Sequence, residues 1–202
     1  MKIALIGATG NAGSRILAEL LQRGHAVTAI VRHPEKVPSQ PGVSACKGDI
    51  LDQDGTAALL SGHDAVISSV HFTATDPDKL LEAVRASGVK RYLVVGGAAS
   101  LEVAPGQKLI DSPDFPAPYL QEATAGAAYL DQLRAEKQID WTYLSPSAMF
   151  VPGERTGQFR LGGDALLVNE EGSSISFEDY AIALVDELEK PAHSRQRFTV
   201  GY

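Results

Sequence analysis

The N-terminal stretch MKIALIGATGNAGSRILAELL, residues 1–21, contains the clearest structural signal in the chain. A short apolar run over Lys2–Ile6 leads without a polar break into Gly7, Gly10 and Gly13, and apolar residues at helical spacing follow. This order predicts a β-strand, a tight glycine turn and a helix. Such a turn needs a positive φ, and the absence of side chains lets a pyrophosphate approach the backbone where the helix begins.

The same stretch supplies the expected phosphate contacts. Backbone N–H groups and the macrodipole at a helix N-terminus favour an anion, and two short polar side chains lie beside them in the sequence. The alternative is that the glycines only make a turn. We expect the phosphates of a dinucleotide to contact Gly7, Thr9, Gly10, Asn11 and Ala12.

Composition limits the class of protein. The chain has 202 residues, of which 44% are hydrophobic and 21% charged, and this suits one globular domain with its own core. The formal net charge of -7 argues against nucleic acid or an anionic membrane as a partner. The one cysteine, Cys46, excludes an internal disulfide framework, and no two histidines have helical metal-ligand spacing, so we expect no metal site.

The expected location is the cytoplasm, because no apolar run approaches the length of a membrane span and the N-terminus lacks a signal-peptide pattern. We expect a monomer or a homodimer.

Strand and helix patterns alternate along the chain. Further strands are expected at 25–31, 43–47, 65–70, 91–97, 139–144, 165–168 and 197–200, and helices at 56–60, 77–87, 119–137 and 176–190. The polar, proline-containing stretch 98–118 is expected to be irregular and to shape a substrate pocket. Together these elements predict an α/β, Rossmann-like, doubly wound and mainly parallel sheet with helices on both faces. Residues 1–202 form one domain in this prediction, and about 146–202 contribute a small substrate-side extension.

Two expected strand ends indicate which nucleotide binds. Arg32 stands where an acidic residue would accept hydrogen bonds from the adenosine ribose. A guanidinium pairs with a 2′-phosphate, so NADP(H) is favoured over NAD(H); alternatively Arg32 is a surface residue and Glu35 serves a ribose. Asp49 and Ile50 are expected to hold the adenine through a carboxylate and a backbone N–H. The alternative is that Asp49 or Asp52 caps a helix.

Other strand ends complete the expected cofactor site. Ligands of open α/β sheets bind outside the carboxyl ends of the strands. The residues predicted to bind the cofactor there are Ser69, Val70, Gly97, Pro146 and Ser147, the last two leaving their strand toward the nicotinamide position.

Several segments together resemble one family. The resemblance is to the atypical short-chain dehydrogenase/reductases of the NmrA-like, NAD(P)H-binding kind, and within them to the small bacterial proteins described as NADH-flavin reductases. The segments that carry it are GATGNAG at 7–13, Arg32, GDI at 48–50 and SPS at 145–147 for the family, and 111–116, 152–157 and 197–202 for the subgroup. It covers essentially the whole chain and implies a Rossmann fold with NAD(P)H across the strand ends.

The proton-transfer pair of typical superfamily members is missing. That pair is a tyrosine four positions before a lysine, which lowers the pKa of the phenol. None of the six tyrosines has a lysine at that spacing. Hydride transfer to a flavin or quinone-like acceptor relies mainly on stacking and orientation, with the proton supplied by water.

We therefore expect an NAD(P)H-dependent oxidoreductase that passes hydride to a planar small molecule, with FMN or FAD as substrate rather than prosthetic group. The alternative is a non-catalytic NADP(H)-sensing regulator of the NmrA type, because the missing pair fits both.

The candidate catalytic residues are Ser100 and Tyr119. The resemblance places Ser100 where a related biliverdin/flavin reductase carries an active-site serine; the alternative is a loop hydroxyl. Tyr119 is expected to form an apolar platform for an isoalloxazine ring together with Met149, Phe150 and Phe159, whereas core packing is the alternative for each of them.

Overall fold

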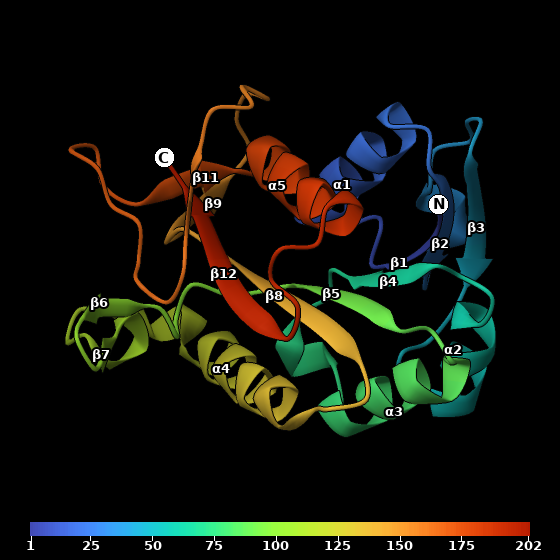
Figure 1. Ribbon diagram of the computed structural model, residues 1–202, viewed down its shortest axis with the longest axis horizontal. Helices are drawn as coiled ribbons and strands as arrows, with labels where there is room; N and C mark the ends of the chain where they lie inside the picture. The colour runs from blue at the N-terminus through green and yellow to red at the C-terminus, as the bar shows by residue number, and fades with distance from the viewer.

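The main strands form one eight-stranded sheet with helices on both faces (Figure 1), in a computed structural model that describes residues 1–202. All neighbouring strands are parallel except β10 and β12. Strand order reverses between β1 and β4, so the predicted doubly wound, Rossmann-like fold is confirmed. In spatial order the strands are β3 (Val43–Lys47), β2 (Ala26–Val31), β1 (Lys2–Ile6), β4 (Ala65–Ser68), β5 (Arg91–Val95), β8 (Asp140–Pro146), β12 (Gln196–Gly201) and β10 (Arg160–Gly162).

Strand β1 lies in the interior of this sheet. Its residue Ile3 pairs with Val27 of β2 on one side and with Ala65 of β4 on the other. Strands that are covered on both faces bury every side chain, which is why Lys2–Ile6 is apolar after its first residue. The carboxyl end of β1 therefore opens at the centre of the sheet edge.

Helices cover the sheet in two layers. Figure 1 shows α1 (Asn11–Gln22) and α5 (Phe177–Glu189) together on one face. The other face carries α2 (Gln53–Leu60), α3 (Pro77–Ser87) and α4 (Leu120–Ala135). Each layer encloses its own cluster of buried apolar side chains. No helix combines the length and the apolar character that crossing a membrane requires.

Three helices begin with side-chain caps. Asp52 accepts a hydrogen bond from the Gly55 amide at the start of α2, Asp76 caps α3 and Ser176 caps α5. The first helix differs, because the N-cap residue of α1 is Gly10, which has no side chain for capping. The N-terminal N–H groups of α1 therefore remain available to a ligand.

The segment 98–118 is more ordered than predicted. It contains a β-hairpin, because a glycine with positive φ at Gly106 turns the chain back on itself. The hairpin strands are β6 (Glu102–Ala104) and β7 (Gln107–Lys108), and two short 3-10 helices follow, η3 (Leu109–Asp111) and η4 (Ala117–Tyr119). Two more 3-10 helices lie elsewhere in the chain, η1 (Pro34–Lys36) after β2 and η2 (Phe72–Ala74) after β4.

The prediction of a strand at 165–168 is wrong. Ala165 makes only an isolated bridge to Glu102, and the strand at this edge is β10, which pairs antiparallel with β12. Residues 165–168 are apolar because Leu167 packs over β12, and this apolar run resembles a strand. The packing is close: a Cβ built on Gly201 of β12 would lie 3.1 Å from the Cβ of Leu167. The exposed edge strand has no such apolar run.

Only part of the range 146–202 lies outside the main sheet. Strand β9 (Met149–Val151) pairs parallel with β11 (Ser174–Ser176), and a loop over 152–159 follows β9. By contrast α5 covers the main sheet and β12 is one of its strands. The substrate-side extension is thus tied to the main domain from both ends.

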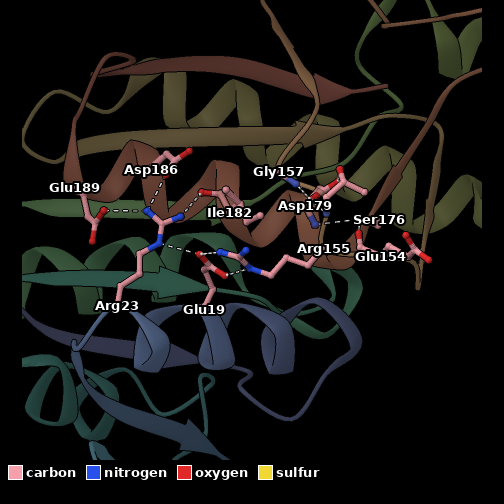
Figure 2. Close-up of polar contacts among 11 residues, drawn as sticks. Glu19, Arg23, Glu154, Arg155, Gly157, Ser176, Asp179, Ile182, Asp186 and Glu189 are labelled. Atoms are coloured by element: carbon pink, nitrogen blue, oxygen red, sulfur yellow. Dashed lines mark hydrogen bonds and ion pairs between the residues drawn. The ribbon is translucent and has the colours of Figure 1, made fainter.

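A buried carboxylate holds the 152–159 loop. Asp179, in the first turn of α5, is fully buried. Its side chain accepts hydrogen bonds from the amide of Gly157 at 2.8 Å (Figure 2), from the amide of Thr156 at 2.8 Å and from the hydroxyl of Tyr202 at 2.9 Å. A charged acceptor with several donors is stabilised despite its burial, so the loop is fixed on α5.

A second carboxylate joins the loop to α1. Glu19 is almost fully buried and pairs with Arg23 and with Arg155 of the loop, each at 2.8 Å (Figure 2). The hydrogen bond from Arg155 is the main reason that the pKa of Glu19 lies below its usual value. Arg23 also reaches Asp186 of α5 at 2.7 Å, so α1, α5 and the loop form one connected network.

The substitution Asp179→Asn replaces one carboxylate oxygen with an amide that cannot accept the loop donors. We expect the free energy of unfolding to fall by about 3 kcal/mol. Urea unfolding measures the change, and Asp186→Asn on the same helix serves as the control. Because Asp186 is more than half exposed, its exposed pair with Arg23 should cost no more than about 1 kcal/mol. Equal losses in the two variants would contradict this role of Asp179.

Candidate functional site

A cavity of about 880 Å³ opens where the carboxyl ends of the central strands meet. Its volume is within the range of cofactor and small-molecule sites. Every residue that the sequence predicted as a cofactor contact lines it, and so do both candidate catalytic residues. The structure thus brings together residues that are far apart in the sequence, from Ile6 to Phe177.

Two glycines make the turn after β1 possible. Gly7 has φ +83°, and a Cβ there would lie 2.1 Å from the carbonyl oxygen of Ser69. A Cβ on Gly13 would lie 2.1 Å from the carbonyl oxygen of Gly7. Any side chain at either position would push β1, β4 and α1 apart, so these glycines are required by close packing.

Gly10 has a different role, because the space next to it is the cavity. A Cβ on Gly10 would meet no protein atom closer than 3.5 Å, and its φ of -74° is one that alanine adopts readily. Beyond it, Asn11 and Ala12 donate no backbone hydrogen bond within the chain, and the first turn of α1 contains no acidic side chain. An uncapped helix end that faces a cavity over a glycine fits a diphosphate.

The opposite rim carries the groups expected near an adenosine. The Arg32 side chain is exposed at the rim, whereas Glu35 is paired with His33 at 3.1 Å. Asp49 accepts a hydrogen bond from the Leu51 amide through Oδ1, and Ile50 lies beside it in the lining. The helix cap is Asp52, so Asp49 retains its second oxygen for a ligand.

Aromatic and apolar side chains line the part of the cavity between η2, α4 and β9, where we expect a planar acceptor from the sequence; we call this part the acceptor end. Tyr119, Met149 and Phe150 are among them, as predicted. Phe159 is not: it packs against the apolar cluster between the sheet and the α1–α5 layer. The expectation for Phe159 is wrong because the 152–159 loop is anchored on α1 and α5, which places this side chain away from the cavity.

Sequence reasoning missed several aromatic residues of this end. Phe72 follows β4 and packs on Tyr129 and Tyr143, with ring centroids 5.7 and 6.2 Å apart. Phe115 comes from the segment after the hairpin, and Phe177 from the start of α5. Of these, only Phe72 carried a usable signal, because it comes soon after the carboxyl end of a predicted strand.

Glu122 of α4 fixes the position of Phe72. It accepts hydrogen bonds from the Phe72 amide at 2.7 Å and from the Thr73 amide and hydroxyl at 3.0 and 2.7 Å. Burial alone would raise the pKa of Glu122, but the hydrogen bonds from Thr73 and Phe72, together with nearby His71, lower it below its usual value. Glu122 is therefore an ionised carboxylate in the cavity wall.

Ser100 is held from behind by a buried arginine. Its hydroxyl oxygen accepts a hydrogen bond from Arg197 at 3.4 Å, and Arg197 is paired with Asp164. A hydroxyl whose oxygen already accepts an arginine N–H keeps its own proton for another acceptor. Ser147 is different, because its hydroxyl donates to the carbonyl of Val200, so its side chain is committed within the protein.

No tyrosine in the cavity wall is placed as an activated proton donor. Tyr143 accepts a hydrogen bond from the Gly97 amide and donates one to the Gly126 carbonyl. Burial raises the pKa of Tyr143. No lysine lines the cavity, so the tyrosine–lysine pair is missing in space as it is in the sequence.

Comparison with known proteins identifies the family. The sequence matches the NAD(P)H-binding family over residues 7–191. It is 43% identical over 211 residues to the uncharacterized protein YwnB of Bacillus subtilis strain 168, covering 99% of this chain and 98% of YwnB.

Two solved structures are similar over their whole length. One is a Bacteroides thetaiotaomicron protein with the provisional name of epimerase, 44% identical with a TM-score of 0.95, and the match covers 100% of this chain and 96% of that one. The other is a Streptococcus pneumoniae protein with the provisional name NADH-flavin reductase, 41% identical with a TM-score of 0.84 and coverage of 100% and 99%.

The substitution Gly10→Ala tests the phosphate site without disturbing the fold. The added methyl group has room against the protein but projects into the space where a diphosphate would lie. We expect affinity for NADP(H) to fall by roughly ten-fold or more. Isothermal titration calorimetry measures it, with Gly163→Ala as the control, because a Cβ there meets no atom within 4 Å. Unchanged affinity in Gly10→Ala would mean that the nucleotide does not use this helix end.

Proposed function

Because this chain belongs to the NAD(P)H-binding family and shares the Rossmann fold of atypical short-chain dehydrogenase/reductases, we propose that it is an NADPH-dependent reductase of a planar flavin or quinone. The observation that carries the proposal is the composition of its cavity. One end offers an uncapped helix and a guanidinium, and the other offers aromatic rings and no tyrosine–lysine pair. A similar protein bears the provisional name NADH-flavin reductase.

The choice of NADPH rests on Arg32. Its exposed guanidinium stands at the end of β2, where a ribose or its 2′-phosphate lies in nucleotide-binding folds. A guanidinium favours the phosphate through paired charge-assisted hydrogen bonds. The competing carboxylate, Glu35, is engaged with His33.

When bound, NADPH would supply a hydride to the acceptor ring and water would supply one proton, so that the products are NADP⁺ and the two-electron-reduced acceptor. The chain contributes orientation. Phe72 and Tyr119 offer faces on which a flat ring stacks, and the Ser100 hydroxyl donates a hydrogen bond to a polar ring atom. Such a site needs no protein acid of matched pKa.

A second candidate is a non-catalytic sensor of NADP(H). The absence of a tyrosine–lysine pair supports it as well, since a sensor needs the cofactor site alone. The two candidates differ in one measurable property, which is turnover that depends on an acceptor.

The decisive assay follows NADPH oxidation with a flavin, with a naphthoquinone and with no acceptor. We expect oxidation that depends on the acceptor and saturates with it, because the aromatic end of the cavity binds the ring next to the nicotinamide. Tight NADPH binding without acceptor-dependent oxidation would contradict the reductase and favour the sensor.

The substitution Arg32→Glu tests the choice of nucleotide. Replacing the guanidinium with a carboxylate repels a 2′-phosphate and accepts hydrogen bonds from ribose hydroxyls, so we expect the ratio of NADPH to NADH affinities to fall roughly 100-fold. Dissociation constants for both nucleotides provide the measurement. Arg134→Glu, with the same charge change on α4, should leave the ratio unchanged. An NADPH preference that survived Arg32→Glu would show that another residue selects the phosphate.

A further inference from the structure

Charge is distributed unevenly along the cavity. Among the residues that line it, Arg32 is the only arginine, no lysine is present, and the acidic residues are Asp49 and Glu122. Arg32 and Asp49 both lie at the adenosine end. The acceptor end therefore contains one fixed ionic group, the Glu122 carboxylate, with the exposed His71 beside it at 3.4 Å.

The carboxylate of Glu122 cannot turn away from the site at low cost. Both of its oxygens are held by donors from the segment of η2, and Phe72, which carries one of these donors, is also part of the aromatic lining. A ring that stacks on Phe72 thus lies close to a carboxylate that is fixed in place. Like charges repel strongly at such short range when the surroundings are partly apolar.

The segment that covers the acceptor end adds further negative charge. Between Ala98 and Ala123 the chain carries a single basic residue, Lys108. Its acidic residues are Glu102, Asp111, Asp114 and Glu122. The summed field over this part of the surface disfavours the approach of an anion.

Arg197, which contacts the lining residue Ser100, does not offset the negative charge of Glu122. Arg197 touches Ser100, but its guanidinium is buried and paired with Asp164. The exposed carboxylate of Asp164 offsets the charge of this guanidinium, so little net charge is offered to a ligand on the other side of Ser100. No lysine and no arginine other than Arg32 lines the cavity.

We infer that the acceptor is an uncharged planar molecule, such as riboflavin or a neutral quinone, and that the phosphates of FMN and FAD are disfavoured by the acidic wall around Glu122. This inference rests on the proposed function, because it names the class of molecule that occupies the acceptor end. The aromatic lining binds the ring, and the carboxylate discriminates among the substituents that the ring carries.

Riboflavin and FMN are a matched pair for the test, since they share the isoalloxazine and ribityl groups and differ in one phosphate. With NADPH saturating, we expect kcat/KM for riboflavin to exceed that for FMN by about ten-fold at low ionic strength. The difference should shrink as salt is added, because screening weakens charge repulsion. A second pair, 1,2-naphthoquinone and its 4-sulfonate, should show the same order.

The substitution Glu122→Gln removes the charge and keeps an oxygen that accepts from the η2 segment. We expect the riboflavin to FMN ratio to fall toward one in this variant, mainly through a better KM for FMN. Asp131→Asn on the same helix is the control, because Asp131 is exposed and does not line the cavity. A ratio that is unchanged in Glu122→Gln would overturn the role of that carboxylate.

Equilibrium binding separates this inference from the proposed function. Quenching of flavin fluorescence in the presence of NADP⁺ gives dissociation constants for riboflavin and FMN without any turnover. Absence of turnover with tighter binding of riboflavin would refute the reductase and support the uncharged-ligand preference. Binding of FMN as tight as that of riboflavin, or binding of neither flavin, would overturn the inference.

Discussion

The close approach of α1 to the ends of β1 and β4 determines where the cavity forms and which groups face it. Gly7 and Gly13 make it possible, because a Cβ on either would overlap a backbone oxygen. The approach places an uncapped helix N-terminus beside the carboxyl ends of the central strands. The other end of the cavity is then defined by whatever segments reach over that sheet edge.

Those segments are held by charges buried on one face of the sheet. Asp179 and Glu19 fix the 152–159 loop on α5 and α1, and the loop continues directly from β9, whose Met149 and Phe150 line the cavity. Glu122 acts in the same way on the other side by holding Phe72. Carboxylates with several donors therefore shape an aromatic pocket that contains few polar groups of its own.

Local sequence patterns predicted most of the strands and helices, and the residues that lie at the carboxyl ends of the strands. The strand Val43–Lys47 and the helix Pro77–Ser87 have the expected bounds. The residues predicted to contact the cofactor all line the cavity, because they lie beside strand ends. The acceptor end was harder, since Glu122 lies 50 residues from Phe72. Phe159 was misplaced because the anchoring of its loop depends on α1 and α5, and no local pattern reveals that.

A crystal soaked in NADP⁺ would show whether the N-terminus of α1 binds the nucleotide. We expect diphosphate oxygens within hydrogen-bond distance of the Asn11 and Ala12 amides, with the 2′-phosphate against the Arg32 guanidinium. A nucleotide bound elsewhere, or a helix end still bare at saturating NADP⁺, would contradict this expectation.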